Sequence, residues 1–330
     1  MERMTTKISV WGPILARRLL QAVALALIVG TLCFFMTISL PGDMAMRIAA
    51  GRYGYDLVGN QAAVAVSAEL GLDRSLWSAL LSWWGDLARL NLGTSLVTGE
   101  MVWHEVTHQL GATIELALAA VFLGVFLGVP MGVWAGLRPH GWIDHITLTL
   151  SVVLRVTPPF LLAVLLMLGV AVSLGVLPVA GDGHATGLLL PGLTLALGLS
   201  AGLARVARNA TFDVVTSAAF EFARTKGLSD WQALCRHGLR NAAVPMVAYL
   251  GVQGVLLVEG AVVVETLFAW PGIGHALVHA VFARDVPVIQ GTALCMGLIF
   301  VIFNLLVDAL CAALDPRRRQ GQEGGYERHS

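Results

Sequence analysis

The sequence predicts an all-α membrane protein with six transmembrane helices, and three observations support that prediction. Of the 330 residues, 57% are hydrophobic and 13% are charged, which is about half the charged fraction of a typical soluble domain. Several apolar runs reach the length of about 20 residues that a helix needs to cross a bilayer. Basic residues gather beside alternate ends of these runs, as they do on the cytoplasmic side of membrane proteins. The formal net charge is +0, which argues against a nucleic-acid partner and leaves membrane lipid as the surrounding medium.

The amino-terminal part is predicted to place one helix before a long extracytoplasmic segment. Residues 1–18 hold four basic residues, and we expect them to be a cytoplasmic N-terminus. The apolar run at 19–40 is longer than the core of a cleaved signal peptide, which indicates an uncleaved first transmembrane helix. Residues 41–110 hold four arginines against seven acidic residues, so they are predicted to lie outside the cytoplasm. That segment is either a helical cap without substrate contact or an extracytoplasmic docking surface.

Residues 111–314 are predicted to form a transmembrane domain of five helices. The first of these, at 112–136, carries a glycine at every fourth position. Its four glycines are Gly124, Gly128, Gly132 and Gly136. A face without side chains lets two helices approach closely in lipid, so we assign the glycines a packing role rather than a site.

The next apolar run, 146–176, is too long for one perpendicular helix and contains Pro158 and Pro159. Each proline removes a backbone donor, so a kink or a tilt is expected there. The remaining transmembrane helices are predicted at 188–204, 244–268 and 288–314. A re-entrant segment on the outer side joins the last two.

Both chain ends are predicted to be cytoplasmic, with residues 315–330 as a cytoplasmic tail. This topology places fifteen of the 21 basic residues inside and five outside, with Arg155 within the membrane. The bias agrees with the usual excess of lysine and arginine on the cytoplasmic side.

A charged stretch, Glu221–Pro245, separates two long apolar runs and is expected to lie on the cytoplasmic side, because Arg205 and Arg208 precede it. Residues 220–226 favour a short amphipathic helix. Phe220 and Ala223 lie on one side of this helix, and Glu221 and Arg224 lie on the other.

Two residues after this helix are expected to shape the chain. Gly227 can adopt a left-handed conformation that ends the helix, and Asp230 can cap a second one.

Several motifs along nearly the whole chain resemble permease subunits in the peptide and nickel branch of binding-protein-dependent ABC importers. Glu221, Ala223 and Gly227 match a Glu-Ala-Ala-three-residues-Gly signature, which continues here as ARTKGL and then RHGLRNAAVP. The stretches VVVETLFAWPGIG, FARDVPVIQG and NLLVDALCAALDPR also match. The resemblance implies a coupling loop at 205–243 that contacts the ATPase. The coupling residues that it implies are Glu221, Ala223, Arg224, Gly227, His237, Arg240 and Asn241.

The resemblance implies a type I importer fold, a second homologous permease, two cytoplasmic ABC ATPases and an extracytoplasmic solute-binding protein. It implies a multi-pass location in the bacterial inner membrane. The chain has no phosphate-binding glycine-rich loop with Lys-Ser/Thr, so it cannot bind ATP by that route. We therefore expect no cofactor and no enzyme activity in this chain, with ATP and Mg bound by the partner ATPases. Peptides are the expected substrates, and nickel or a metal chelate is the alternative.

Three ionisable residues fall within apolar runs: Arg155, Glu259 and Glu265. A charge in the membrane costs several kcal/mol unless it faces a cavity or a partner. Glu265 matches the VVVET motif, whereas Glu259 stands where the resemblance implies a glycine. These residues either line the translocation pathway or, for Arg155 and Glu259, form a structural ion pair.

Two pairs of histidines, each with its members one helical turn apart, are candidate metal sites. The stretch HEVTH, His104 to His108, literally matches the zinc-protease pattern, and a membrane zinc protease is a remote alternative function. A catalytic zinc also needs a third protein ligand and an enclosed site. His275 and His279 are weak candidates for a transient metal site, and the simpler interpretation is a polar rim.

Overall fold

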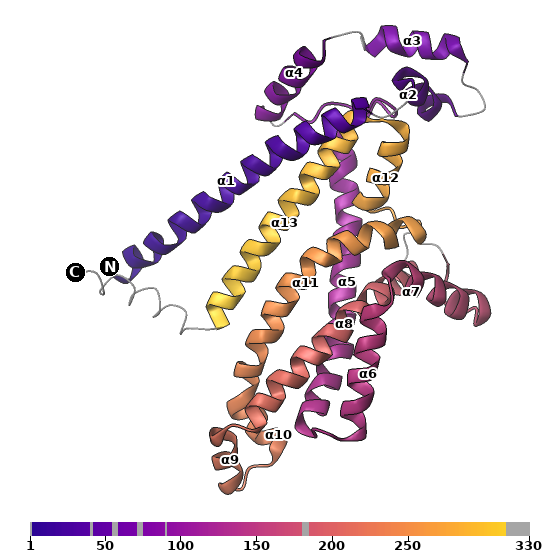
Figure 1. The fold of residues 1–330 in the computed structure, drawn as a ribbon. Coiled ribbons are helices and arrows are strands. Elements are labelled where there is room, and N and C mark those ends of the chain that lie inside the picture. Colours follow the sequence, from indigo (N-terminus) through magenta and orange to yellow (C-terminus); the bar gives the residue numbers. More distant parts are fainter. Residues whose placement is uncertain are drawn as a thin grey trace. The chain divides into compact units, whose positions relative to one another are not determined.

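The computed structural model describes residues 2–39, 42–54, 59–70, 75–89, 91–179 and 185–314. This part of the chain is helical, and its two bridge residues, Thr94 and Met101, form an isolated pair rather than a strand (Figure 1). The helices are α1 (Glu2–Ser39), α2 (Met44–Tyr53), α3 (Asn60–Leu70), α4 (Leu76–Ala88), α5 (Val102–Leu137), α6 (Trp142–Val156), α7 (Pro159–Leu166), η1 (Met167–Ser173), α8 (Ala185–Val215), α9 (Ala218–Thr225), α10 (Asp230–Ala233), η2 (Leu234–Gly238), α11 (Leu239–Leu267), α12 (Ile273–Ala283) and α13 (Val286–Leu314). The α class predicted from the sequence is confirmed.

Four helices of the described chain are long and apolar enough to cross a bilayer. They contain Arg18–Met36, Val102–Leu137, Thr186–Val215 and Val286–Leu306. The bent pair α6 and α7–η1 makes a fifth if it counts as one span. Helix α11 is 29 residues long but is not among these, and the side chains of 255, 256, 258 and 259 within it lie outside the described part. The structure thus supports four or five spans, and the sixth stays a prediction.

The chain divides into two compact units. The first comprises Met1–Thr113 and Pro271–Val301, and the second comprises Ile114–Trp270 and Ile302–Ser330. Helices α5 and α13 each contribute residues to both units. The candidate sites described below each fall within one unit.

The glycines of α5 in the second unit lie against α8, as the sequence predicts. A Cβ on Gly128 would sit 2.8 Å from the Ser200 carbonyl oxygen, and one on Gly136 would sit 2.6 Å from that of Arg208. Gly132 would meet the backbone of Ala204 in the same way. Since no side chain fits there, the regular glycine spacing is explained by close helix packing.

The predicted break in the third apolar run is confirmed. Helix α6 ends at Val156, and α7 begins with Pro159 at its first position, where a missing N–H costs nothing. The two helices are bent by 105° relative to one another.

Helix α8 runs from Ala185 to Val215, beyond the transmembrane span expected at 188–204. The part of α8 beyond that span carries an ion pair to α6 in the same unit. The Arg208 guanidinium donates to both carboxylate oxygens of Asp144 in α6, at 2.9 and 2.8 Å. Asp144 also accepts from the His140 backbone N–H at 2.9 Å and is 2% exposed. Such a two-bond pair is among the stronger kinds of charged contact, so it joins α6 to α8.

In the first unit, α12 packs beside the start of α5. A shared apolar cluster contains Val102 and Val106 from α5, Ile273 and Ala280 from α12, and Val288 from α13. The α12 N-terminus is fixed by a hydrogen bond from the Ile273 N–H to the Thr113 hydroxyl oxygen, at 2.8 Å. This packing holds the polar residues of both helices in fixed positions.

Candidate functional site

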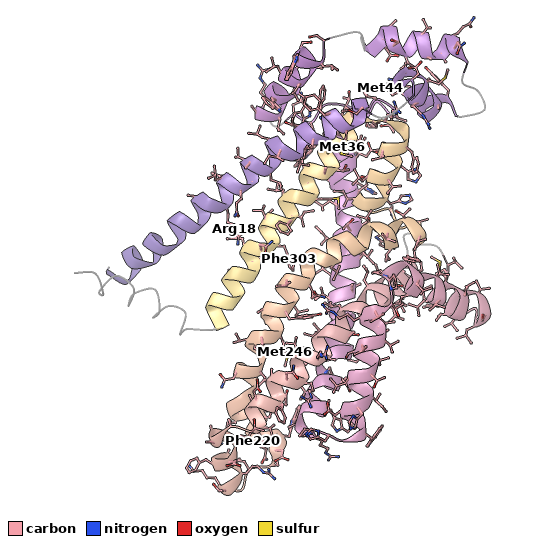
Figure 2. The ribbon with its side chains drawn as sticks, in the orientation of Figure 1. Arg18, Met36, Met44, Phe220, Met246 and Phe303 are labelled. Atoms are coloured by element: carbon pink, nitrogen blue, oxygen red, sulfur yellow. The ribbon has the colours of Figure 1, made fainter. Side chains whose placement is uncertain are left out.

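The α9–α10 segment, residues 217–234, has the amphipathic helix that the sequence predicts. Phe220 and Ala223 are buried at 2% and 4% exposure, in a cluster that also includes Leu234. Glu221 and Arg224 are exposed on the other side of α9. Figure 2 shows Phe220 at the end of the second unit where α9 lies. The helix is therefore anchored by its apolar side and offers its charged side for contact.

Gly227 ends α9 in a left-handed conformation with φ 86°, which confirms the prediction. The Gly227 N–H bonds the Arg224 carbonyl at 2.9 Å, and the Leu228 N–H bonds that of Ala223 at 3.3 Å. This pair of bonds is the Schellman motif, which sets the direction in which the chain leaves a helix. No described atom lies within 4 Å of a Cβ built on Gly227, so the requirement for glycine comes from the backbone alone.

The expected capping role of Asp230 is wrong, because Ser229 is the N-cap of α10. The Ser229 hydroxyl accepts from the Gln232 N–H at 3.3 Å, and the Gln232 side chain accepts from the Ser229 N–H at 3.1 Å. This capping box was detectable in the sequence as Ser-x-x-Gln. Asp230 instead forms an exposed ion pair with Arg224 at 3.2 Å.

The other expected coupling residues are only partly described. The side chains of His237 and Arg240 lie outside the described part of the structure. Asn241 is exposed and lines a cavity of about 290 Å³ together with Asp213, Ser217 and Phe220. That cavity joins the start of α9 to the start of α11.

The three ionisable residues of the apolar runs differ in exposure and in contacts. Glu265 is fully buried at 0% exposure. Arg155 is exposed in this chain and donates a hydrogen bond to the Tyr249 hydroxyl oxygen at 3.3 Å. The Glu259 side chain lies outside the described part, so its pairing with Arg155 stays a prediction.

The HEVTH stretch forms the beginning of α5, with His104 and His108 both exposed. Within the described residues, no three His, Cys, Asp or Glu side chains are grouped so that they could hold a metal ion. A zinc-protease site is therefore not supported by this geometry. Glu105, between the two histidines, instead lines a cavity.

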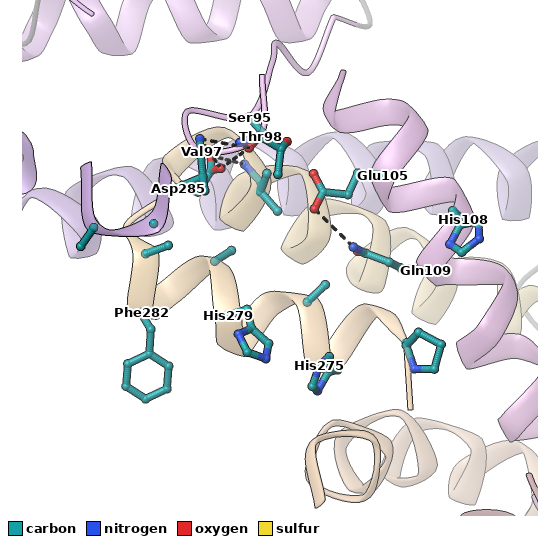
Figure 3. Close-up of a pocket in the computed structure, with 18 residues that line it drawn as sticks. Ser95, Val97, Thr98, Glu105, His108, Gln109, His275, His279, Phe282 and Asp285 are labelled. Carbon is teal, nitrogen blue, oxygen red and sulfur yellow. Dashed lines mark hydrogen bonds between the residues drawn. The ribbon is translucent and has the colours of Figure 1, made fainter. Parts of the chain in front are cut away.

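This cavity, here called the Glu105 pocket, has a volume of about 610 Å³ and lies within the first unit. Its walls come from α2, the loop at 95–98, the first turns of α5, and α12 (Figure 3). Its polar lining residues are Ser95, Thr98, Glu105, His108, Gln109, His275, His279 and Asp285. The histidines and Glu105 stand out in the sequence as HEVTH and as a pair one helical turn apart, whereas no sequence pattern pointed to Ser95, Gln109 and Asp285.

Asp285 fixes one wall of the Glu105 pocket. Its carboxylate accepts hydrogen bonds from the Ser95 hydroxyl, from the Leu96 N–H at 3.1 Å and from the Val97 N–H at 3.3 Å. Ser95 and Asp285 are both buried. A carboxylate with this many donors stabilises the loop, and Asp285 is therefore assigned a positioning role.

The floor of the Glu105 pocket carries His275 and His279, whose ring centroids lie 4.5 Å apart in an edge-to-face arrangement. Burial, and then the neighbouring His279, hold the pKa of His275 below its usual range. The spacing of the two imidazoles expected from the sequence is thus observed, while a metal role for them stays a prediction.

Comparison with known proteins agrees with this architecture. Residues 128–320 match the family described as binding-protein-dependent transport system inner membrane component. A putative peptide transport system permease protein of Brucella abortus is 36% identical over 314 residues, covering 93% of this chain and 98% of that protein. A glutathione transport system permease protein of Pectobacterium atrosepticum is 38% identical over 303 residues, covering 92% and 97%.

Among solved structures, inward-facing MetNI methionine ABC transporter matches with a TM-score of 0.51 and 18% identity, covering 64% of this chain and 96% of that chain. This likeness shows the fold of an ABC transporter membrane subunit. The chain belongs to the family of inner membrane components of binding-protein-dependent transport systems. It is a multi-pass membrane subunit and not an enzyme, as the sequence predicted.

Proposed function

We propose that this chain is the permease subunit of an ABC importer for peptides, and that its α9–α10 segment couples it to an ATPase. The relatives named as peptide and glutathione permeases support the substrate class. The observation that supports the coupling role is the geometry of α9. One side is anchored by Phe220 and Ala223, the other carries exposed Glu221 and Arg224, and the exit angle is set at Gly227.

A short helix transmits force only if both its base and its exit are fixed. Burial of the Phe220 ring fixes the base, and the two hydrogen bonds around Gly227 fix the exit. The partner ATPases then act on the exposed charges of α9, which we place on the cytoplasmic side. A second permease and an extracytoplasmic binding protein complete the importer. Nickel or a metal chelate is the alternative substrate.

The test is the ATPase activity of the reconstituted complex, stimulated by peptide-loaded binding protein. Gly227→Val should abolish this stimulation, because a β-branched residue disfavours the left-handed conformation by about 1 to 2 kcal/mol or more. Gly227→Asn is the matched control and should retain most of the stimulation, since asparagine tolerates that conformation.

A second control separates local strain from coupling. Gly175 also has positive φ, 63°, with no described atom within 4 Å of a Cβ, and it lies in the same unit. Gly175→Val should leave the stimulation near the wild-type value. Full stimulation of the Gly227→Val complex would contradict the coupling role.

A further inference from the structure

We propose that the Glu105 pocket binds the primary ammonium group of a small ligand, with the Glu105 carboxylate and the Gln109 amide oxygen as its acceptors. The inference rests on the proposed function only in taking a peptide amino terminus as the source of that ammonium group. Nothing in the coupling argument depends on this pocket.

Glu105 and Gln109 are hydrogen-bonded to one another in the pocket wall. The Gln109 amide nitrogen donates to Oε1 of Glu105 at 3.4 Å. This bond fixes the orientation of the amide, because the opposite orientation would set its oxygen against a carboxylate. Oε2 of Glu105 and Oε1 of Gln109 are then both buried, and neither has a hydrogen-bond partner among the described residues. Figure 3 shows the bonded pair between the 95–98 loop and α12.

The two buried oxygens are both acceptors, and this determines the chemistry of the ligand. Buried polar atoms in native proteins are almost always hydrogen-bonded, so a donor is expected at this place. A primary ammonium group supplies three donors and a positive charge, which matches a carboxylate and an amide oxygen at once. A neutral ligand lacks the charge, and an anion is repelled by the Glu105 carboxylate.

Glu105 is the carboxylate of the pocket that is available to a ligand. Asp285 also lines the pocket, but Ser95, Leu96 and Val97 already donate to its two oxygens. The negative charge of Asp285 still favours a cation in the pocket, and its hydrogen bonds hold the 95–98 loop in place. Of the two carboxylates in the lining, Glu105 therefore makes the direct contact.

The charge state of His275 and the volume of the cavity both suit an organic cation. His275 is kept neutral because burial lowers its pKa, so it adds no repulsive charge at neutral pH. The volume of about 610 Å³ is within the usual range of roughly 300 to 1,000 Å³ for small-molecule sites. A single metal ion would not need such a volume, and the described residues do not group three metal ligands. An organic cation fits both observations.

The experiment measures equilibrium binding to the purified four-subunit complex by calorimetry, without ATP. The probes are dialanine, which has a free ammonium group, and N-acetyl-dialanine, which does not. We expect dialanine to bind and N-acetyl-dialanine to bind at least about tenfold more weakly. This comparison uses the wild-type protein, so it does not depend on how a variant folds. Equal affinities, or no binding of dialanine at millimolar concentration, would overturn the proposal.

Two variants test the acceptors. Glu105→Gln keeps the shape of the side chain and removes its charge, and it should weaken dialanine at least about tenfold. Gln109→Met removes the second acceptor with little change in volume and should also weaken dialanine. Glu100→Gln is the matched control, because Glu100 is exposed and does not line the pocket. Unchanged affinity in Glu105→Gln, or an equal loss in Glu100→Gln, would contradict the assignment.

The same experiment distinguishes this inference from the proposed function. If dialanine fails to bind while loaded binding protein still stimulates the wild-type ATPase, only the pocket assignment fails. If dialanine binds as expected while Gly227→Val keeps full stimulation, only the coupling role fails. Ni²⁺ is the remaining probe. If Ni²⁺ competes with dialanine and its binding is lost in His275→Ala, the pocket is a metal site and not an ammonium site, which would overturn the proposal.

Discussion

The α9–α10 segment and the Glu105 pocket are built in opposite ways. The segment is one continuous stretch, anchored by apolar burial and shaped by backbone hydrogen bonds between residues a few positions apart. The pocket draws its walls from four separate stretches of the chain and places polar atoms out of solvent. A surface that transmits force needs a stiff backbone, whereas a pocket that selects a ligand needs polar groups that the protein itself leaves unpaired.

The energetics of the two regions differ accordingly. The exposed Arg224–Asp230 pair, at 3.2 Å, belongs to a class worth about 0 to 1 kcal/mol. Each buried acceptor without a partner costs about 1 to 3 kcal/mol, which a ligand with suitable donors recovers. Charges should therefore matter little for stability in the segment and much for binding in the pocket.

The largest effect is expected from Phe220→Ala. Removing a buried phenylalanine costs about 3 to 5 kcal/mol, so the α9–α10 segment should lose its anchor. We expect rapid proteolysis within 217–245 and loss of stimulated ATPase activity, with dialanine binding at the Glu105 pocket unchanged. Phe222→Ala, on the same helix but 61% exposed, is the control for the anchor and should leave the rate of proteolysis near the wild-type value. A parallel loss of dialanine binding in Phe220→Ala would show that the two regions are not independent.

Asp285→Ala should have the next largest effect, this time on the pocket. It leaves the Ser95 hydroxyl and the Leu96 N–H without their acceptor, at about 1 to 3 kcal/mol for each group that stays buried, while the Val97 N–H keeps the Ser95 hydroxyl oxygen at 3.2 Å. Dialanine affinity should fall at least about tenfold, while unstimulated ATPase activity should stay normal. Asp285→Asn keeps one acceptor oxygen and should recover part of the affinity. Normal dialanine affinity in Asp285→Ala would remove the positioning role.

A smaller effect should separate Ser229 from Asp230. Ser229→Ala removes the N-cap of α10 and should cost about 1 kcal/mol of local stability. Asp230→Ala removes an exposed ion pair and should cost less than about 0.5 kcal/mol. Hydrogen exchange of the α10 amides measures both. The reverse order would restore Asp230 as the cap.

The smallest effect concerns pH and the pocket. Besides His275, the titratable lining groups are Glu105, His108, His279 and Asp285. Because burial and His279 lower the pKa of His275, this imidazole stays neutral until the pH falls below its usual range. Below that point it gains a positive charge, and dialanine affinity should weaken by less than about tenfold. Calorimetry from pH 7.5 to 5 checks this, and His275→Gln should remove the part of the loss that the imidazole causes, leaving the part that protonation of the Glu105 carboxylate causes. Binding that strengthens on acidification would contradict it.

The sequence by itself determined the features that depend on neighbouring residues. The lengths of the apolar runs predicted the membrane class, and Pro158–Pro159 predicted the break between α6 and α7. The spacing of Phe220 and Ala223 predicted the buried side of α9, and Gly227 predicted its end. Each of these depends on periodicity or backbone conformation within a few residues, which a sequence displays directly. The Ser229 cap is equally local, because the Ser-x-x-Gln pattern indicates it directly. The prediction of Asp230 as the N-cap was therefore wrong although the sequence held the correct signal.

Only the tertiary structure decided where distant polar groups meet. Arg208 lies beyond the transmembrane span predicted at 188–204, and only the structure shows that it pairs with Asp144, 64 positions away in the chain. Glu105 and Gln109 face one cavity with His275 because α5 and α12 share an apolar cluster. Hydrogen bonds and ion pairs act over a few ångströms in space and carry no periodic signal along the chain. Their partners are therefore set by packing, which the local pattern of residues does not specify.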